Sequence, residues 1–205
     1  MKLYYMPATC ALAPHIAACE AGLDLELVEV KRGERGLIFG DGQDYAAINR
    51  KGKVPALEVD GGIITETQVI LQYIAAQAPD RLPFPTDGMP RWHMLETLNF
   101  ITTELHRGFS PLWSPNVAPA HKAEIIEAIG RAFTTLEVLI GDRVFLGGEH
   151  FTVADAYAFV ATGWASLFDI DLAPWPVLRA YRARIAARPG VQQAQREEGL
   201  ATGKI

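Results

Sequence analysis

Hydrophobic and polar positions follow two different periods within the first thirty residues. Residues 2–5 (KLYY) are rich in aromatic side chains, and residues 25–30 (LELVEV) alternate apolar with acidic ones. Each pattern predicts a short, half-buried strand. Between them, residues 10–22 (CALAPHIAACEAG) are rich in alanine and end at Gly22, which predicts a helix. The first thirty residues therefore predict a β-α-β unit, with two parallel strands joined by a right-handed crossover.

The following fifty residues combine a glycine-rich segment with a clear hairpin pattern. Residues 31–44 carry four glycines and mixed charge, which predicts an irregular surface segment before a short helical turn at 45–48. In residues 54–66 (VPALEVDGGIITE), two apolar runs flank Asp60-Gly61-Gly62, which predicts an antiparallel pair of strands. Apolar residues then recur at helical spacing over 66–78. These signals predict a small mixed sheet with covering helices.

A proline-rich stretch separates this part from a purely helical remainder. Residues 79–90 (PDRLPFPTDGMP) contain four prolines, which indicates a boundary. Strand signals are absent beyond it, and helical spacing predicts helices near 91–108, 120–141, 153–168 and 175–188. Thr152 and Asp155 have the spacing of a capping box for the third of these helices. We expect an α/β domain at 1–79, a linker at 80–89 and an all-α helical bundle at 90–205.

Composition narrows the functional classes. The chain has 205 residues, of which 49% are hydrophobic, and 19 basic against 24 acidic residues give a net charge of −5. No basic run is present, so we expect no nucleic-acid partner. No apolar run is long enough to span a membrane, and no secretory core precedes Pro7, so we expect a cytoplasmic protein with no membrane association. Two cysteines cannot form a disulfide framework, and we expect both as free thiols.

Cys10 is the first candidate for chemistry. It stands at the start of the first predicted helix, at the strand-end crevice where open sheets commonly bind ligands. Helix N-termini lower a thiol's pKa, although a free cysteine is equally often a small buried hydrophobe. Cys19 follows nine positions later, on the opposite helix face and roughly 13 Å away, so no internal disulfide can form and we expect Cys19 in the core. Any redox chemistry at Cys10 therefore needs an external thiol.

Four segments together resemble one enzyme family over essentially the whole chain. They are residues 2–30, 49–67 (NRKGKVPALEVDGGIITET), 98–112 (LNFITTELHRGFSPL) and 151–159 (FTVADAYAF). They are similar to bacterial beta-class glutathione transferases. The resemblance implies a thioredoxin-like N-terminal domain, an all-helical C-terminal domain, a homodimer and glutathione as cosubstrate. It also implies that Cys10 contacts the glutathione sulfur and can form a mixed disulfide with it.

The resemblance implies which residues of the N-terminal domain contact glutathione. It implies a cis bond at Val54-Pro55, with the Val54 backbone pairing with the tripeptide, although a proline opening a strand needs no such explanation. The helix start at Glu66-Thr67 can hold the γ-glutamyl carboxylate, with Glu66 on its ammonium. The family usually has serine where this chain has Thr67. A capping box formed by Thr65 and Gln68 would explain only the flanking residues.

Further contacts come from the first helix of the bundle. Asn99, Thr103 and His106 recur at four and three residues, which predicts a polar stripe that is either solvated or functional. The resemblance places His106 and Arg107 beside the glutathione sulfur, with arginine in place of the usual lysine.

Other positions carry weaker assignments. By the same resemblance, Asn99 and Glu104 reach the glutathione of the neighbouring subunit, and Arg35 lies near a family lysine that binds the glycyl carboxylate. We expect Tyr157 and Trp164 in the core, although Trp164 could line an apolar pocket.

No metal site is expected, because the histidines show no ligand spacing with cysteines or carboxylates. They are His15, His93, His121 and His150.

These features predict a glutathione transferase that conjugates glutathione to small apolar electrophiles, with thiol-disulfide exchange through Cys10 as a second activity. Two alternatives stay open. One is a glutathione-binding carrier of apolar ligands with little turnover. The other is a specialised glutathione-dependent isomerase, ether-cleaving enzyme (lyase) or dehalogenase, because one fold supports many chemistries. No local motif identifies the second substrate.

Overall fold

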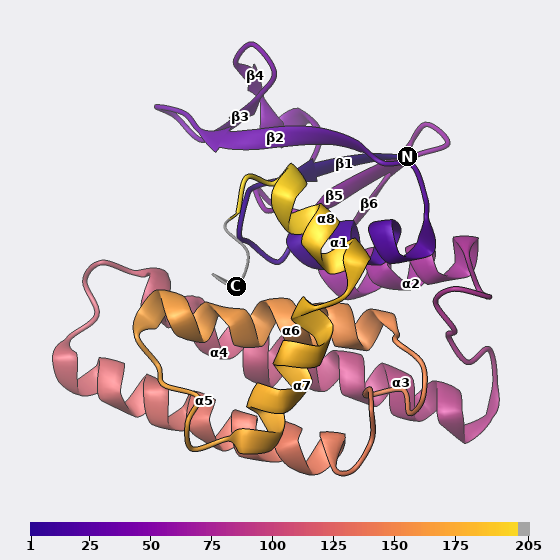
Figure 1. The fold of residues 1–205 in the computed structure, drawn as a ribbon. Helices are drawn as coiled ribbons and strands as arrows, with labels where there is room; N and C mark the ends of the chain where they lie inside the picture. The colour runs from indigo at the N-terminus through magenta and orange to yellow at the C-terminus, as the bar shows by residue number, and fades with distance from the viewer. Residues whose placement is uncertain (201–205) are drawn as a thin grey trace.

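The N-terminal part is a mixed sheet covered by helices, as the β-α-β and hairpin patterns predict. The computed structural model describes residues 1–200, and within them six strands pair in the order β4-β3-β2-β1-β5-β6 (Figure 1). Their bounds are β1 (Lys2–Tyr5), β2 (Glu26–Arg32), β3 (Leu37–Phe39), β4 (Gln43–Asp44), β5 (Ala56–Val59) and β6 (Gly62–Thr65). Strands β1 and β2 are parallel, and the other pairs are antiparallel. The predicted hairpin is the β5-β6 pair.

Residues 31–44 are not irregular, so that prediction was wrong. They extend β2 and add β3 and β4 to the sheet edge, with Val30 opposite Phe39 and Ile38 opposite Asp44. The glycines lie in the turns: Gly40 and Gly42 have φ values of 52° and 104°, which glycine adopts without a steric penalty. The glycines therefore marked the turns of a meander. A 3₁₀ turn at Tyr45–Ala47 follows, close to the predicted helical turn.

The remainder is helical, as predicted from its periodicity. The helices are α1 (Leu12–Ala21), α2 (Thr67–Gln77), α3 (Gly88–Phe100), the π-helix η2 (Ile101–His106), α4 (Arg107–Phe109), the 3₁₀ turn η3 (Ser110–Trp113), α5 (Pro119–Ile140), α6 (Val153–Gly163), the 3₁₀ turn η4 (Trp164–Phe168), α7 (Pro176–Ala186) and α8 (Pro189–Glu197). The helix expected over 91–108 is thus interrupted by a π segment. No helix within residues 1–200 has the length and apolarity needed to span a bilayer.

Helix α8 was not predicted, and it changes how the two parts meet. After α7 the chain returns to the sheet, and α8 packs along α1 (Figure 1). Helix α1 also contacts α6 and α2. The first helix of the sheet domain is therefore enclosed by elements from both halves of the sequence.

Helix α6 lies at the centre of the molecule and is buried along its whole length. The predicted capping box at its start is confirmed: the Asp155 carboxylate accepts hydrogen bonds from the backbone N–H and hydroxyl of Thr152, each at 2.8 Å. It also accepts from the Leu146 N–H at 2.8 Å and the Tyr181 hydroxyl at 2.7 Å. Four donors compensate the burial of this carboxylate.

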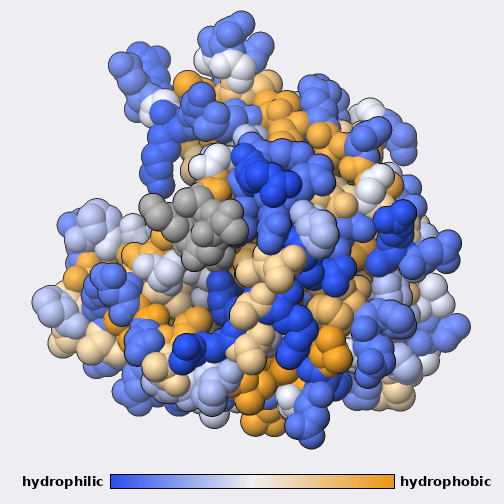
Figure 2. Space-filling view, viewed as in Figure 1, coloured by the Kyte–Doolittle hydropathy of each residue, from blue (hydrophilic) through white to orange (hydrophobic). Residues whose placement is uncertain are grey.

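Hydrophilic side chains cover much of the outer surface over α8, with apolar patches below it (Figure 2).

Candidate active site

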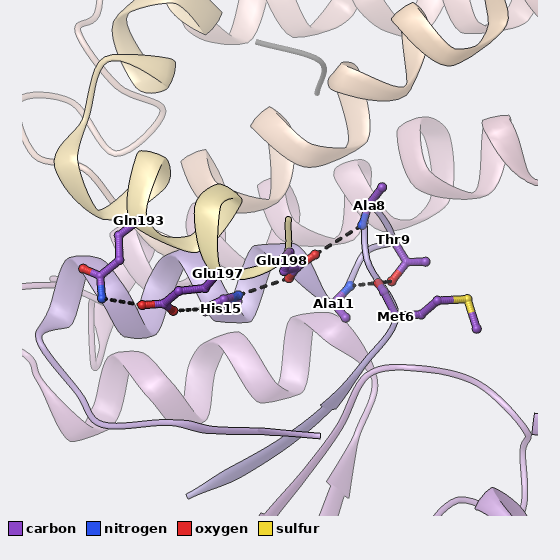
Figure 3. Close-up of polar contacts among 8 residues, drawn as sticks. All are labelled: Met6, Ala8, Thr9, Ala11, His15, Gln193, Glu197 and Glu198. Atoms are coloured by element: carbon purple, nitrogen blue, oxygen red, sulfur yellow. Dashed lines mark hydrogen bonds and ion pairs between the residues drawn. The ribbon is translucent and has the colours of Figure 1, made fainter. Parts of the chain in front are cut away.

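Cys10 lies in the loop that joins β1 to α1. The Thr9 hydroxyl donates to the Met6 carbonyl at 2.7 Å and accepts from the Ala11 N–H at 3.3 Å, which closes the loop on itself (Figure 3). Helix α1 begins at Leu12, so Cys10 precedes the first turn in which it was expected.

The helical part of the chain fixes this loop through Ala8. Ala8 has a φ of 63°, a conformation that costs energy for a residue with a Cβ. Its N–H donates to Glu198 at 3.2 Å, and its carbonyl accepts from the indole N–H of Trp164 at 2.9 Å. The conformation that presents Cys10 is therefore held by residues more than 150 positions away.

The Cys10 thiol is buried and protonated. Only 8% of the residue is exposed, and Sγ donates to the Val54 carbonyl at 3.4 Å. Burial raises the pKa of Cys10 to about 11, and hydrogen bonding to the Thr67 hydroxyl and the backbone offsets only part of that rise. The expectation that the helix start would lower this pKa was wrong. The free protein thus offers an S–H donor at this point.

The segment before β5 forms the wall facing Cys10. The Val54-Pro55 bond is cis, as the family resemblance implied. The preceding carbonyl, that of Lys53, accepts from the Asn49 side-chain amide at 2.6 Å and from the Tyr45 hydroxyl at 3.1 Å. These two partners were not identified from the sequence, because neither belongs to a recognisable motif.

The chain turns sharply between β6 and α2. Glu66 occupies the cap position with a φ of 74°, and Thr67 is the first helical residue. The capping box predicted for Thr65 and Gln68 was wrong, because Thr65 is the last residue of β6 and pairs with Ala56. The exposed Glu66 carboxylate instead forms an ion pair with the ammonium group of Lys51.

Thr67 and Tyr157 connect the sheet domain to the bundle. Thr67 is 6% exposed, and hydrogen bonding to its hydroxyl lowers the pKa values of both Cys10 and Tyr157. The Tyr157 hydroxyl lies 2.6 Å from Nδ1 of His106. Burial nevertheless raises the pKa of Tyr157 overall, so it remains a neutral phenol. The sequence predicted Tyr157 only as a core residue. No other polar residue lies three or four positions from it, so nothing in the sequence indicated that its hydroxyl belongs to the site.

His106 is neutral rather than cationic. It ends the π-helix, a feature that occurs frequently at functional sites. Burial lowers its pKa to about 4, assisted by the positive charges of Lys53 and Arg107. A neutral imidazole carries one N–H, so when Tyr157 donates to Nδ1 the proton lies on Nε2. His106 therefore contributes no positive charge to the site.

Aromatic side chains extend from His106 to the surface. The Trp164 ring centroid lies 5.0 Å from that of His106 and 6.1 Å from that of Trp113. Trp164 is 2% exposed, as expected for a core residue, whereas Trp113 is 53% exposed and contacts Phe168 at 4.9 Å between centroids. We call Trp113, Trp164 and Phe168 the aromatic wall.

The remaining sequence candidates lie on the surface. Asn99, Glu104 and Arg107 are exposed along α3, η2 and α4, and Arg35 is exposed in the turn between β2 and β3. Within residues 1–200, no hydrogen bond or ion pair joins these four to Cys10, His106 or Glu66.

Comparison with known proteins supports the resemblance seen in the sequence. The family model described as "Glutathione S-transferase, N-terminal domain" matches residues 1–76, and the one described as "Glutathione S-transferase, C-terminal domain" matches residues 119–184. Glutathione S-transferase GstA of Escherichia coli O157:H7 is 40% identical over 202 residues, covering 98% of this chain and 100% of its own.

Solved structures agree with the sequence comparison. A sphingomonad glutathione S-transferase complexed with glutathione has a TM-score of 0.91 and 39% identity. The beta class enzyme of Sphingomonas chungbukensis has a TM-score of 0.90, also with 39% identity. Each match covers 98% of this chain and 100% of the other.

Proposed function

Because the chain belongs to the glutathione S-transferase family, on its bacterial beta-class branch, we propose that its site joins glutathione to small apolar electrophiles. One observation carries this proposal: the Cys10 thiol, the Thr67 hydroxyl, the Tyr157 phenol and the His106 imidazole form a chain of neutral polar groups across the seam between the sheet and the bundle. Neutral donors at such a seam can stabilise a negatively charged sulfur without neutralising it.

Glutathione lies between β5 and the start of α2 in this proposal. Its backbone pairs with Val54 beside Pro55 as an added strand. Its γ-glutamyl carboxylate meets the first-turn N–H groups at Glu66-Thr67, and its ammonium replaces Lys51 as the partner of Glu66. Arg35 binds the glycyl carboxylate. Because Thr67 directs its hydroxyl inward, we expect the backbone N–H groups to provide most of the carboxylate binding.

The second subunit completes the site. The chain forms a homodimer in this proposal, and the exposed Asn99 and Glu104 reach the glutathione bound by the neighbouring subunit. The exposed Arg107 adds positive charge near the sulfur. A cytoplasmic location fits the two free cysteines, which a reducing compartment maintains as thiols.

Conjugation uses the thiolate of glutathione itself. On binding, the Cys10 S–H turns from the Val54 carbonyl to the glutathione sulfur, to which the His106 Nε2–H also donates, and the sulfur's own proton leaves to solvent. Stabilising that thiolate by one pKa unit takes about 1.4 kcal/mol, which lies within the range of one or two charge-assisted hydrogen bonds. The sulfur then attacks the electrophilic carbon, a carbon–sulfur bond forms, and the leaving group departs with its electron pair. The exposed Trp113 and the half-buried Phe168 of the aromatic wall receive the apolar part of the substrate, and the buried Trp164 supports them from behind.

Thiol transfer is the slower second activity. A Cys10 thiolate attacks the glutathione sulfur of a mixed disulfide, which forms a Cys10-glutathione disulfide and releases the other thiol as thiolate. A free glutathione thiolate then attacks this bond, restores Cys10 and leaves as glutathione disulfide. The raised pKa of Cys10 makes its thiolate scarce at neutral pH, which is why we rank this reaction second.

The proposal is tested by turnover with an aryl halide and with a small mixed disulfide. We expect His106→Ala to lower kcat/KM for the aryl halide at least tenfold while the protein still binds immobilised glutathione. His93→Ala, which removes an exposed histidine from α3, is the matched control and should change neither property. A wild-type protein that binds the resin and turns over neither substrate would instead be a glutathione-binding carrier.

A further inference from the structure

The face of α1 that packs against α8 carries a second group of chemically active side chains. His15 and Cys19 lie one helical turn apart on α1, and Glu197 ends α8, which packs against that helix. One ligand atom from each of these three residues lies within 4.8 Å of the other two. Imidazole nitrogen, thiol sulfur and carboxylate oxygen are the three protein ligand types of zinc.

Each of two ligands is already oriented by a further partner. Nδ1 of His15 lies 3.1 Å from the buried Glu198 carboxylate, which directs Nε2 toward Glu197 at 2.7 Å (Figure 3). The Gln193 side-chain amide donates to the second oxygen of Glu197 at 2.9 Å. A carboxylate on the far nitrogen of a histidine is the usual outer partner of a metal ligand, because it fixes the ring orientation.

From this arrangement we infer that His15, Cys19 and Glu197 bind one Zn²⁺ ion, with water as the fourth ligand. The donor set selects the ion: a thiolate with an imidazole disfavours Ca²⁺ and Mg²⁺, which prefer oxygen. Solvent can reach the site, because the Glu197 side chain is 42% exposed and Cys19 is only partly buried. The ion would tie α8 to α1.

The charges around the site favour a cation. Glu197 and Glu198 flank His15 on both ring nitrogens. Binding replaces the proton on His15 Nε2 and the proton on the Cys19 sulfur, and both are released to solvent. His15 Nδ1 keeps its hydrogen bond to Glu198 as an outer partner. In chain order Glu197 follows His15 by 182 positions, so the sequence analysis, which expected no metal site, had no local signal for the third ligand.

The site is tested by metal content after dialysis of the full chain against Zn²⁺ at pH 8. We expect one Zn²⁺ per chain in the wild type and in Cys10→Ala, and at least a tenfold weaker affinity in Cys19→Ala and Glu197→Gln. Both of these variants change partly exposed residues, so we expect them to fold, which circular dichroism will verify. Wild-type protein with Zn²⁺ should also unfold at a higher temperature, because the ion binds only the folded state.

Co²⁺ gives an independent spectroscopic readout. We expect a thiolate-to-cobalt charge-transfer band in the wild type and in Cys10→Ala that is absent from Cys19→Ala. Equal Zn²⁺ content in the wild type and Cys19→Ala, a Co²⁺ spectrum without the thiolate band, or loss of binding in Cys10→Ala would each overturn the assignment. Binding that survives Glu197→Gln unchanged would also exclude the three-ligand site.

Discussion

The two cysteines stand near opposite ends of one helix, and their surroundings differ. Cys10, just before α1, is buried among a carbonyl, a hydroxyl and apolar side chains. Cys19, in the last turns of α1, lies beside His15 and Glu197 at the contact with α8. Burial outweighs the hydrogen bonds to Cys10 and the positive charge of Lys53, so the thiol stays protonated and acts as a hydrogen-bond donor. The Cys19 sulfur lies within 4.8 Å of a histidine nitrogen and a carboxylate oxygen, which makes Cys19 a potential metal ligand instead.

The comparison also separates what a helix provides from what its neighbours provide. Both cysteines belong to the same short segment, yet neither role follows from the helix alone. The Cys10 side depends on Val54, Thr67 and the bundle residue Tyr157. The Cys19 side depends on α8, at the far end of the chain. In each case the chemistry arises where a distant element is brought against α1.

The largest change in stability should come from removing Glu198, which pairs with His15 near Cys19. Glu198→Ala removes a fully buried carboxylate that accepts from His15 Nδ1 and the Ala8 N–H, and both of these donors lose that partner. We expect a loss of about 3 kcal/mol in the free energy of unfolding, measured by urea denaturation of metal-free protein. Glu197→Ala is the control; its carboxylate is part exposed, so it should cost about 1 kcal/mol or less. Equal losses in the two variants would show that the burial of Glu198 does not increase its contribution to stability.

The next largest effect, a loss of catalytic rate, should come from Tyr157, which links Thr67 near Cys10 to His106. Tyr157→Phe removes only the hydroxyl that lies 2.6 Å from His106 Nδ1 and leaves the ring in place. We expect kcat/KM for an aryl halide to fall about tenfold, which corresponds to about 1.4 kcal/mol of transition-state stabilisation. Stability should fall by about 1 kcal/mol, the usual contribution of one buried hydrogen bond. An unchanged kcat/KM would remove Tyr157 from the site and leave it as a packing residue.

The pH dependence of alkylation tests whether the Cys10 thiol is protonated at neutral pH. Because the pKa of Cys10 is about 11 in the folded protein, its thiolate fraction, and with it the rate of alkylation by iodoacetamide, should rise about tenfold per pH unit from pH 7 to 10. Mass analysis of the Cys10 peptide in Cys19→Ala measures this rate. A plateau below pH 8 would contradict the raised pKa.

The same pKa has a consequence for stability. The folded value lies above the unfolded value of 9.0, so the unfolded chain loses the thiol proton first as pH rises. The folded state is therefore favoured less above pH 9, and Cys10→Ala should lose less stability between pH 8 and pH 10 than the wild type.

The smallest effect should come from Cys19 in the absence of metal. Cys19 is partly buried at the edge of the core, so Cys19→Ala removes little apolar area. We expect a change below about 1 kcal/mol in urea denaturation with a chelator present. A larger loss would indicate that Cys19 contributes to packing rather than to ion binding.

Much of the fold could be predicted from periodicity alone. The β-α-β unit, the hairpin around Asp60-Gly61-Gly62 and the bundle helices all carry strong local patterns. The edge strands β3 and β4 were missed because short strands between glycines resemble a loop. Helix α8 was missed because it is short and mostly polar, with only Val191 and Ala194 as buried apolar side chains, and it is stabilised by contact with α1.

The site was predicted less completely than the fold. Position at a helix start pointed to Cys10 and Thr67, and the family resemblance added Val54 and His106; the structure links Cys10 with Val54 and Thr67. Tyr157 carried no signal, since a tyrosine in an apolar helix gives no indication of where its hydroxyl points. The pKa of Cys10 was also misjudged, because it depends on burial, which no local sequence pattern measures.

The most direct measurement is the intact mass of the protein after incubation with glutathione disulfide. It compares the wild type with Cys10→Ala and with Cys19→Ala, which exchanges the other cysteine as a matched control. If a bound glutathione sulfur reaches Cys10, the wild type and Cys19→Ala gain one glutathione each, faster at pH 9 than at pH 7, and Cys10→Ala gains none. Adduct formation that persists in Cys10→Ala and is lost in Cys19→Ala, or no adduct on any of the three proteins, would contradict the placement of glutathione beside Cys10.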